Sequence, residues 1–596
     1  MKTVNRMLAT LILASGFGLG TFAQENQTYI LHTVEKGQSL YSIASMYGVS
    51  QTDIVQLNPG SEERIYIGHT LRIPRQASNA LKETYHTIVQ GETLYRLSQK
   101  YNVSSKAICD ANPGLSAQNF RIGQVVRIPA PEPSTPADSI TSSQVTGQNA
   151  LQGPVQSRCR DMHRVKRKET VYSISREYKI TEAELIAANP ELKGKNKIKK
   201  GSFLCIPYPT TSTLTPEATQ TTIPTDDELF SQNKKKSEKF STIKAAVILP
   251  FLNQGSTRNE SARMVEYYEG FLMAVDSLKR QGTSIDLYTY HAGQDVPAVQ
   301  AILNKPELKD MDVIFGPLMP QQIKPLADFA KQHNSRLVVP FTSKDNTVFR
   351  NPAVYQINTP QSYLYSEVYE HFVRQFPNAH VIFIEATSGT REKAEFIKGM
   401  KEELRNRSIP MTILKEDADM EKMKSVLKAN RTNIFIPTSG SNLVLIKILP
   451  QLTLLVRDTP DTSVHLFGYP EWQTYTKDFL DAFFELDTYF YSSFYTNNLL
   501  PAAKSFTHSY RKWYGKEMDE RYPKYGMLGF DTGYFFLKGL SNYGSDLENN
   551  LLKMRLTPIQ TGFKFQRVNN WGGFINRKVF FVRFTKNFEL IKLDFD

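Results

Sequence analysis

His32-Thr33-Val34-Glu35-Lys36-Gly37-Gln38-Ser39-Leu40-Tyr41 organises the first third of this 596-residue chain, because the same block occurs there three times. It returns at 86–95 as HTIVQGETLY and, with more changes, at 163–172 as HRVKRKETVY. Asn58-Pro59, Asn112-Pro113 and Asn189-Pro190 each follow the histidine of their block by 26 residues, and each unit closes on a short apolar segment that ends in proline. Three copies with one internal spacing predict three small modules of the same fold.

The hydrophobic pattern inside a repeat changes between strand and helix periodicity. In the first copy, Thr33-Val34 and Thr70-Leu71-Arg72-Ile73 alternate as short strands do. Between them, residues 39–47 place their apolar side chains at helical spacing, and Ser39 can cap that helix. Residues 52–57 give a second helix that ends at Asn58-Pro59-Gly60. We therefore expect each module to be strand–helix–helix–strand.

This pattern resembles the LysM domain, because it combines Gly-Gln-Ser-Leu or Gly-Glu-Thr-Leu with the Asn-Pro pair and a closing Arg-Ile-Pro. LysM domains bind N-acetylglucosamine polymers, chiefly peptidoglycan and chitin. The resemblance assigns LysM modules to 28–74 and 84–129, and a degenerate third one to 158–207. It implies a shallow glycan groove between the first strand–helix loop and the loop before the last strand.

Backbone amides at the helix start could hold an acetamido carbonyl in such a groove, and an apolar edge could pack on the sugar. Taken one at a time, the same residues could instead only shape turns. The glycan-binding residues that the resemblance implies are Gly37, Gln38, Ser39, Leu40, Asn58, Pro59, Ile65 and Tyr66 in the first repeat, and Gly91, Glu92, Thr93, Leu94, Asn112, Pro113, Phe120 and Arg121 in the second.

The third repeat departs from the pattern. Lys168 replaces the loop glycine, and Lys199-Lys200 replace apolar groove residues, so we do not expect a sugar site there. It could instead meet peptide-stem carboxylates or act as a spacer. Cys159 and Cys205 lie near its first and last strands, and a disulfide could join them if those strands are neighbours. Cys109, in the second repeat, is expected to be a small buried apolar group.

Residues 1–23 have the layout of a secretory signal peptide. Lys2 and Arg6 precede an apolar run from Leu8 to Leu19, and Thr21-Phe22-Ala23 offers small residues before a cut at Gln24. A membrane anchor is the alternative, although the run is short for a bilayer. Export predicts a protein of the periplasm or cell wall. The formal net charge of +13 then indicates an anionic wall polymer or lipid rather than nucleic acid, unless the basic residues only solvate the surface.

The rest of the chain predicts two linkers and one large domain. Residues 130–157 and 208–242 are rich in Ser, Thr and Pro and are expected to be linkers. From 243 to 596, apolar strands alternate with amphipathic helices, which predicts a doubly wound α/β architecture. The expected strands are 245–250, 285–290, 313–315, 337–339, 381–384, 433–436 and 464–468, and the expected helices are 265–278, 298–303, 321–333, 391–405 and 443–449.

Several segments of 243–596 resemble type I periplasmic binding proteins, the fold of branched-chain amino-acid receptors. They include Phe315-Gly316-Pro317, 339–343 (VPFTS), 468–472 (GYPEW) and 529–533 (GFDTG). The resemblance implies two hinged lobes, with crossings near Thr359, Asn497 and Pro558. Ligands of open α/β sheets bind beyond the carboxyl ends of strands. The cleft candidates are therefore Thr342, Ser343, Thr438, Ser439 and Trp472, each of which could instead cap or pack.

We expect a non-enzymatic envelope protein that binds peptidoglycan and presents an α/β domain to a wall-synthesis or envelope protein or to a small solute. The sequence indicates no cofactor, and its ten histidines form no His-x-His or His-Glu-x-x-His metal motif. A Gly-x-Ser-x-Gly nucleophile elbow is also missing. The alternatives are a solute-binding protein of an amino-acid-type transporter and a cell-wall hydrolase.

Overall fold

The computed structural model describes residues 29–35, 38–62, 65–74, 84–130, 161–165, 169–178, 180, 182–189, 192, 198, 203–206, 224–234, 237–252, 258–387, 392–498 and 500–595. The chain forms two compact units, residues 1–132 with 224–596 and residues 133–223. The predicted signal peptide, Gly37, Cys159, Lys168, Lys199 and Lys200 lie outside the described residues. Within the described parts, no helix combines the length and apolar character that crossing a bilayer requires.

Each repeat has the predicted strand–helix–helix–strand order, and its two strands pair antiparallel. The first repeat is β1 (Tyr29–Thr33), α1 (Leu40–Tyr47), α2 (Gln51–Leu57) and β2 (Thr70–Pro74). The second is β3 (Thr84–Thr87), α3 (Leu94–Tyr101), α4 (Ser105–Ala111) and β4 (Val125–Ile128). The third, in the other unit, is β5 (Asp161–Arg164), α5 (Val171–Glu177), α6 (Glu182–Ala188) and β6 (Phe203–Ile206).

The helix starts follow the predicted capping chemistry. The side chains of Ser39, Thr93 and Thr170 each accept a hydrogen bond from the backbone N–H three residues on. In the third repeat, Met162 lies opposite Cys205 in the strand pair, and the proposed partner Cys159 lies outside the described residues. The predicted disulfide therefore stays a prediction.

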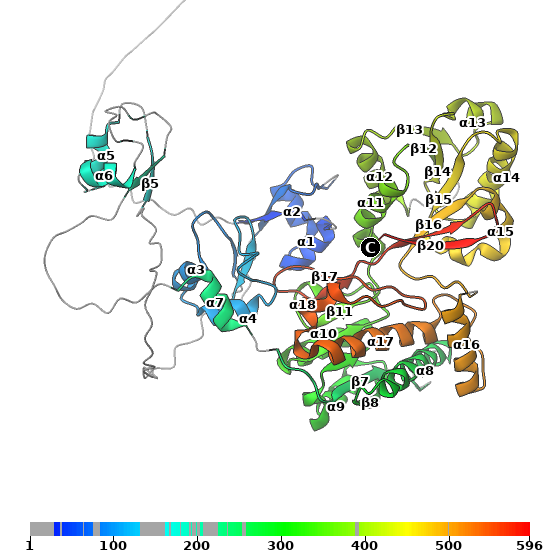
Figure 1. The fold of residues 1–596 in the computed structure, drawn as a ribbon, viewed down its shortest axis with the longest axis horizontal. Coiled ribbons are helices and arrows are strands. Elements are labelled where there is room, and N and C mark those ends of the chain that lie inside the picture. Colours follow the sequence, from blue (N-terminus) through cyan, green and yellow to red (C-terminus); the bar gives the residue numbers. More distant parts are fainter. Residues whose placement is uncertain are drawn as a thin grey trace, which may run out of the picture. The chain divides into compact units, whose positions relative to one another are not determined.

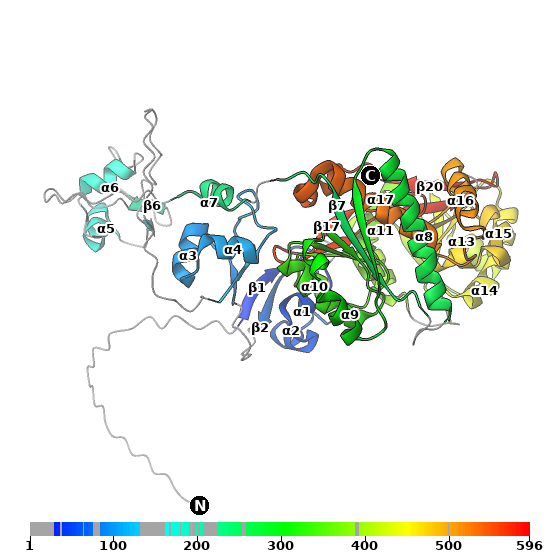
Figure 2. The same ribbon diagram turned by 90° about the horizontal axis from the view of Figure 1, so that it is seen from below.

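The first lobe of the α/β domain is built on a seven-stranded sheet with the order β17-β18-β11-β10-β9-β7-β8 (Figure 1). Alternate residues of β7 pack on opposite sides, Ala245 and Val247 against α8 and α17, and Ala246 and Ile248 against α9 and α10 (Figure 2). Its elements are β7 (Ile243–Leu249), α8 (Arg258–Arg280), β8 (Ile285–His291), α9 (Val296–Leu303), β9 (Val313–Phe315), α10 (Ile323–Gln332), β10 (Arg336–Val339), β11 (Val354–Gln356), α16 (Pro501–Tyr514), α17 (Tyr525–Tyr543), α18 (Leu547–Asn550), β17 (Phe565–Arg567) and β18 (Phe574–Asn576).

The second lobe has its own seven-stranded sheet with the order β13-β12-β14-β15-β16-β19-β20, in which β19 and β20 are antiparallel. Both lobes are thus doubly wound, as predicted. The elements of this lobe are α11 (Tyr365–Gln375), β12 (Ala379–Glu385), α12 (Ala394–Asn406), β13 (Met411–Lys415), α13 (Met420–Val426), β14 (Thr432–Pro437), α14 (Asn442–Asp458), β15 (Val464–Gly468), α15 (Thr476–Glu485), β16 (Thr488–Ser492), β19 (Phe580–Phe584) and β20 (Leu590–Asp594). Short 3-10 turns also connect the elements, η2 to η8: Pro306–Asp310, Pro320–Gln322, Thr347–Phe349, Gln361–Tyr363, Pro470–Thr474, Gly544–Asp546 and Leu551–Lys553.

The chain passes between the lobes three times, and one of the three predicted positions is wrong. The first two crossings lie between β11 and α11 and between β16 and α16, which fits the positions predicted near Thr359 and Asn497. The third lies at 577–579, between β18 and β19, rather than near Pro558. Residues 565–576 form a hairpin that first extends the first-lobe sheet beside β11.

The second predicted linker contains a helix, so its assignment as a linker over all of 208–242 is wrong. Helix α7 spans Asp226–Asn233, and Thr225 and Glu228 form a capping box at its start. Leu229 and Phe230 pack against the second repeat, which supplies the apolar partner that a short helix needs.

The first two repeats are packed against the first lobe. Residues of the first repeat and of the first lobe share one hydrophobic core, which includes Tyr47, Phe349 and Trp571. The second repeat adds a backbone hydrogen bond from Gly114 N–H to Asn570 O, 2.8 Å long. These modules and the lobe therefore form one body rather than a domain on a tether.

Candidate functional sites

One predicted glycan-binding side chain in each repeat, Gln38 in the first and Glu92 in the second, belongs to a hydrogen-bond network that joins the first strand to the first helix. Gln38 Oε1 accepts a hydrogen bond from Glu35 N–H and lies 2.7 Å from Nε2 of His32, whose Nδ1 lies 2.8 Å from the Tyr47 hydroxyl. The second repeat repeats this arrangement. There, Glu92 Oε2 lies 2.6 Å from Nε2 of His86, whose Nδ1 lies 2.9 Å from the Tyr101 hydroxyl.

The hydrogen bonds of this network also shift the pKa of Glu92. Burial works to raise the pKa of the Glu92 carboxyl, but hydrogen bonds from Val89, His86 and Lys100 outweigh it, and the pKa is lowered. Glu92 is therefore a carboxylate that serves the fold of the module. Gln38 and Glu92 stand at equivalent positions of the two blocks, and each serves as a hydrogen-bond acceptor in the same internal network.

The asparagines of the Asn-Pro pairs fasten the second helix to the last strand. Asn112 Nδ2 donates to Ile108 O and Arg127 O, and its Oδ1 accepts from Arg127 N–H. Asn58 makes the same three bonds with Ile54 and Arg72. These side-chain amides are thus hydrogen-bonded within the module, and the glycan-binding role of Asn58 and Asn112 stays a prediction.

The exposed part of each predicted groove lies in the loop before the last strand. Tyr66 is 43% exposed, Pro59, Pro113 and Arg121 are exposed, and Ile65 and Phe120 are half-buried. Sequence reasoning missed Ile67 and Ile122, which are the most exposed large apolar side chains of the two repeats, at 67% each. The sequence carried a signal for them, because each is followed by a glycine, Gly68 or Gly123, at equivalent positions of the two repeats. Both glycines have positive φ in the structure.

The two helix starts differ in how the rest of the unit covers them. Ser39 and Leu40 are half-buried, with the Tyr363 hydroxyl beside Ser39 and Ser42, and Tyr41 donates a 2.9 Å hydrogen bond to Asn346 Oδ1 of the first lobe. In the second repeat, Gly91 is exposed and Thr93 half-buried, whereas Leu94 is fully buried.

The cleft candidates all follow strands, as predicted, but they do not line one surface. Trp472 is fully buried, donates from Nε1 to Gly440 O and stacks on Phe483, so its assignment to a cleft lining is wrong. Thr438 accepts from Ala386 N–H, and Ser439 is buried. Thr342 and Ser343 are half-buried in the first lobe, where Thr342 Oγ1 accepts from Lys344 N–H.

Charged groups at the strand ends of the second lobe satisfy one another. Lys393 Nζ lies 2.7 Å from Glu471 Oε1 and sits over the Tyr469 ring. Glu392 Oε1 accepts hydrogen bonds from the Ser439 hydroxyl and from Gly440 N–H. A ligand at these strand ends would have to replace an ion pair and a carboxylate that are already hydrogen-bonded, which carries a desolvation cost.

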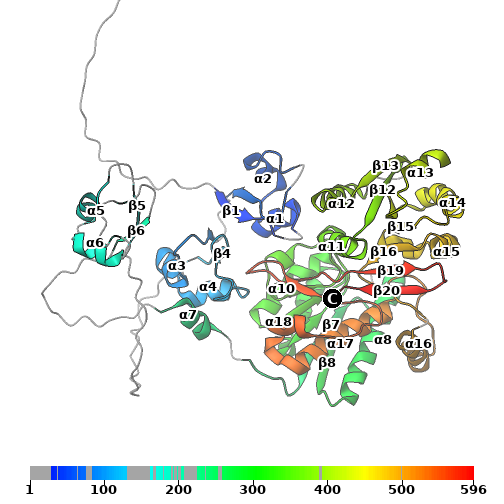
Figure 3. The ribbon, with the colours of Figure 1, turned by 45° about the horizontal axis from the view of Figure 1, so that its top comes forward.

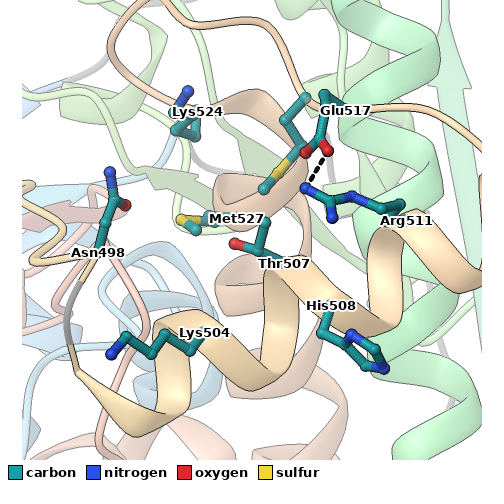
Figure 4. Close-up of a pocket in the computed structure, with 9 residues that line it drawn as sticks. Asn498, Lys504, Thr507, His508, Arg511, Glu517, Lys524 and Met527 are labelled. Carbon is teal, nitrogen blue, oxygen red and sulfur yellow. Dashed lines mark ion pairs between the residues drawn. The ribbon is translucent and has the colours of Figure 1, made fainter.

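A cationic pocket of about 350 Å³ lies in the first lobe between α16 and the start of α17 (Figure 4). Lys504, His508 and Arg511 come from α16, and Lys524 precedes α17. Arg511 pairs with Glu517, and burial lowers the pKa of Lys524, which donates to Asp519 O. The chemistry of the lining suits a small anion. The other lining residues are Asn498, Thr507, Glu517, Met518 and Met527.

No group of His, Cys, Asp and Glu side chains that could hold a metal ion occurs among the residues that the structure describes. These elements define a class of protein in which a two-lobed α/β domain carries small repeat modules. The LysM domain model matches residues 32–74, 86–129 and 163–207, so the chain contains three LysM domains.

Curated relatives include amidases, which match this chain only over its LysM region. They include the N-acetylmuramoyl-L-alanine amidase sle1 of Staphylococcus haemolyticus, 26% identical over 129 residues, which are 21% of this chain and 39% of that protein. The autolysin of Enterococcus faecalis is 29% identical over 105 residues, 16% of this chain and 14% of that protein. The chain thus spans less than half of the length of each of these two relatives.

Solved structures similar to this chain are solute-binding proteins. One is a putative branched-chain amino acid ABC transporter protein from Rhodospirillum rubrum, with 11% identity, a TM-score of 0.42, and coverage of 59% of this chain and 100% of that chain. Another is an ABC transporter substrate-binding protein from Desulfitobacterium hafniense in complex with Leu, with 14% identity, a TM-score of 0.34 and the same coverage.

Proposed function

We propose that this chain is an exported, non-enzymatic protein of the cell envelope that binds peptidoglycan through its LysM domains. In this proposal its α/β domain presents a surface to an envelope or wall-synthesis protein, in a scaffolding or regulatory role, in the periplasm or at the cell wall. The basic character of the chain, with a formal net charge of +13, suits a wall polymer that carries carboxylates.

The observation that carries the proposal is the shared core between the first LysM domain and the first lobe. A glycan held by that LysM domain would fix the position and orientation of the α/β domain on the wall. That arrangement suits a scaffold, which must stay in place. A receptor that delivers solute to a transporter has to move between wall and membrane, so the arrangement gives the transporter alternative less support.

The test uses the full chain, because removing residues 1–242 would uncover Trp571. Three purified proteins are each sedimented with peptidoglycan: the wild type, the Ile67→Asp/Ile122→Asp variant and the Phe588→Asp variant. The Phe588→Asp variant is the control, because it changes another exposed apolar side chain. We expect the double variant to bind about tenfold more weakly or worse, since the loss of a central apolar contact commonly costs over 1 kcal/mol. Equal sedimentation of all three would move the site elsewhere, and no sedimentation of the wild type would end the proposal.

The hydrolase alternative is tested in the same mixtures. We expect no soluble muropeptides or reducing ends to be released from peptidoglycan over long incubation. The amidase relatives match this chain only over its LysM region, so the comparisons give no catalytic domain to this chain. Release of fragments by the wild type would overturn the non-enzymatic assignment.

A second candidate function rests on the cationic pocket. A small-solute binder of this fold would take an anion between Lys504, His508 and Lys524 rather than an amino acid at the strand ends. Thermal unfolding with inorganic phosphate and with dicarboxylates tests this. A rise in Tm that Lys504→Glu abolishes and Lys512→Glu, on the same helix, retains would support it, and no rise with any anion would exclude it.

A further inference from the structure

Helix α7, which begins at Asp226, packs on the second LysM domain, which ends at residue 129 (Figure 3). Asp226 Oδ1 accepts a 2.8 Å hydrogen bond from the backbone N–H of Leu94. Leu229, 7% exposed, belongs to the same hydrophobic core as Leu94. Phe230 lies against Phe120, with 5.9 Å between the ring centroids.

These contacts fall on both walls of the predicted glycan groove. Leu94 begins α3 directly after the loop between the first strand and helix, and Phe120 lies in the loop before the last strand. The N–H of Leu94 lies in the first turn of α3, where a helix leaves its amides without a partner. The Asp226 carboxylate accepts a hydrogen bond from this amide, as the acetamido carbonyl of a bound sugar would. The Phe230 ring covers the apolar edge on which a sugar would pack.

The first LysM domain provides an internal comparison. Its Leu40 is equivalent to Leu94, yet it is half-buried whereas Leu94 is fully buried. The sequences around the two leucines are nearly the same, Gly-Gln-Ser-Leu and Gly-Glu-Thr-Leu. The additional cover in the second domain comes from a segment outside the module, and α7 is that segment.

We propose that α7 is a built-in competitor for the second LysM groove, so that this domain binds N-acetylglucosamine glycan only when α7 undocks. The inference rests on the proposed function, since it assumes that the groove takes glycan. An isolated helix of eight residues is marginal in water, so α7 loses its helical structure when it leaves. Its attachment to β7 keeps it near the groove, and glycan has to compete with a high effective concentration.

The first test removes the carboxylate that occupies the groove. Asp226→Ala is compared with Asp227→Ala, the same change at the exposed neighbour, in the full chain by calorimetric titration with an N-acetylglucosamine pentamer. We expect Asp226→Ala to bind the pentamer about tenfold more tightly, because a hydrogen bond to a charged group contributes about 1.5 kcal/mol or more. Equal affinities of the two variants would overturn the inference. If no protein binds the pentamer, the proposed function fails instead.

The second test locks α7 in place. The Asn233 side chain contacts the Cys109 thiol of α4, so Asn233→Cys places two thiols side by side. Oxidation should join them and abolish pentamer binding at the second domain, and reduction should restore it. Gln232→Cys, at an exposed neighbour, is the control and should bind equally in both states. Failure of the Cys109 cross-link to form, or unchanged binding in the locked protein, would contradict docking of α7 over the groove.

Discussion

The rings of Tyr47 and Trp571 lie 6.0 Å apart between centroids, and this contact joins the first LysM domain to the hairpin that extends the first-lobe sheet. Tyr85 of the second LysM domain lies 5.2 Å from the ring centroids of both. Trp571 is only 2% exposed. Three parts of the chain therefore complete one aromatic cluster, and the first lobe depends on the LysM domains to bury its tryptophan.

Replacement of Trp571 by Ala should cost about 3–5 kcal/mol of stability, because it removes a large buried ring that packs on two other modules. It should also loosen the first two LysM domains, so that limited proteolysis releases them faster than from the wild type. Unfolding in urea, followed together with the proteolysis pattern, measures both effects.

The chain provides two controls for this substitution in its other tryptophans. Trp513 is 48% exposed, and its change to Ala should leave both readouts close to the wild type. Trp472 is fully buried in the second lobe, so Trp472→Ala should lower stability without releasing the LysM domains. If Trp571→Ala releases the LysM domains no faster than Trp472→Ala does, the modules are not held by this cluster.

Arg336, the first residue of β10, and Glu548 on α18 form a bidentate ion pair, with Nε–Oε1 and Nη2–Oε2 distances of 2.7 and 3.0 Å. The Tyr355 hydroxyl donates to Oε1 of the same carboxylate. Glu548→Gln should cost about 3 kcal/mol, since it leaves the guanidinium of Arg336, whose side chain is 9% exposed, without its counter-charge.

The matched control has the same two-point geometry at the surface. Arg457 and Glu485 lie 2.6 and 2.8 Å apart, with the Arg457 side chain 67% exposed. Glu485→Gln should change urea unfolding very little, because water screens an exposed pair. Equal losses from Glu548→Gln and Glu485→Gln would show that burial does not decide the contribution of this contact.

The strands and helices of the α/β domain could be predicted because each is encoded locally. Val247 and its neighbours form an uninterrupted apolar run, and such a run indicates a strand covered on both faces. The third crossing could not be predicted in this way. Its position depends on the pairing of Phe574 with Tyr355, far away in the sequence, and no local pattern reports that pairing.

The candidate sites show the same division between local and long-range information. The LysM repeats and their loops are visible in the sequence, but the use of Asn58 and Asn112 within the module depends on carbonyls of the distant last strand. Trp472 follows a strand as a cleft residue would, yet it packs over Gly468 inside the lobe. Helix α7 had a local signal in Thr225 and Glu228, which the Thr- and Pro-rich sequence before it concealed.

Asn112→Asp should destabilise the second LysM domain by about 1–3 kcal/mol, because a buried side chain loses both of its donors, which bond the carbonyls of Ile108 and Arg127. Hydrogen exchange of the α4 and β4 amides in the full chain measures the effect locally. Gln99→Glu makes the same amide-to-carboxylate change at an exposed position of α3 and should leave this exchange unchanged. Unchanged exchange in Asn112→Asp would show that the asparagine does not hold the module together.

Asp531 on α17 should make the protein lose stability as pH rises toward neutrality. Its carboxylate accepts hydrogen bonds from Ile559, Gln560 and Thr561 N–H, but burial outweighs them and raises its pKa to about 6. A carboxyl whose pKa is higher in the folded than in the unfolded state binds its proton more tightly when folded. Its stabilising contribution is therefore complete below the ordinary Asp range and is lost as pH rises through about 6.

The free energy of unfolding in urea, measured from pH 4 to pH 7, tests this sign against Asp531→Asn, which cannot titrate. The variant should be less stable at every pH, because its amide cannot accept from all three N–H groups. The advantage of the wild type over the variant should shrink by about 2 kcal/mol across this range. Asp487, whose pKa is lowered to about 2 chiefly by Arg583 and His465 against its burial, changes its contribution at lower pH and does not disturb the comparison. A constant or growing advantage would show that Asp531 is ionised throughout this range.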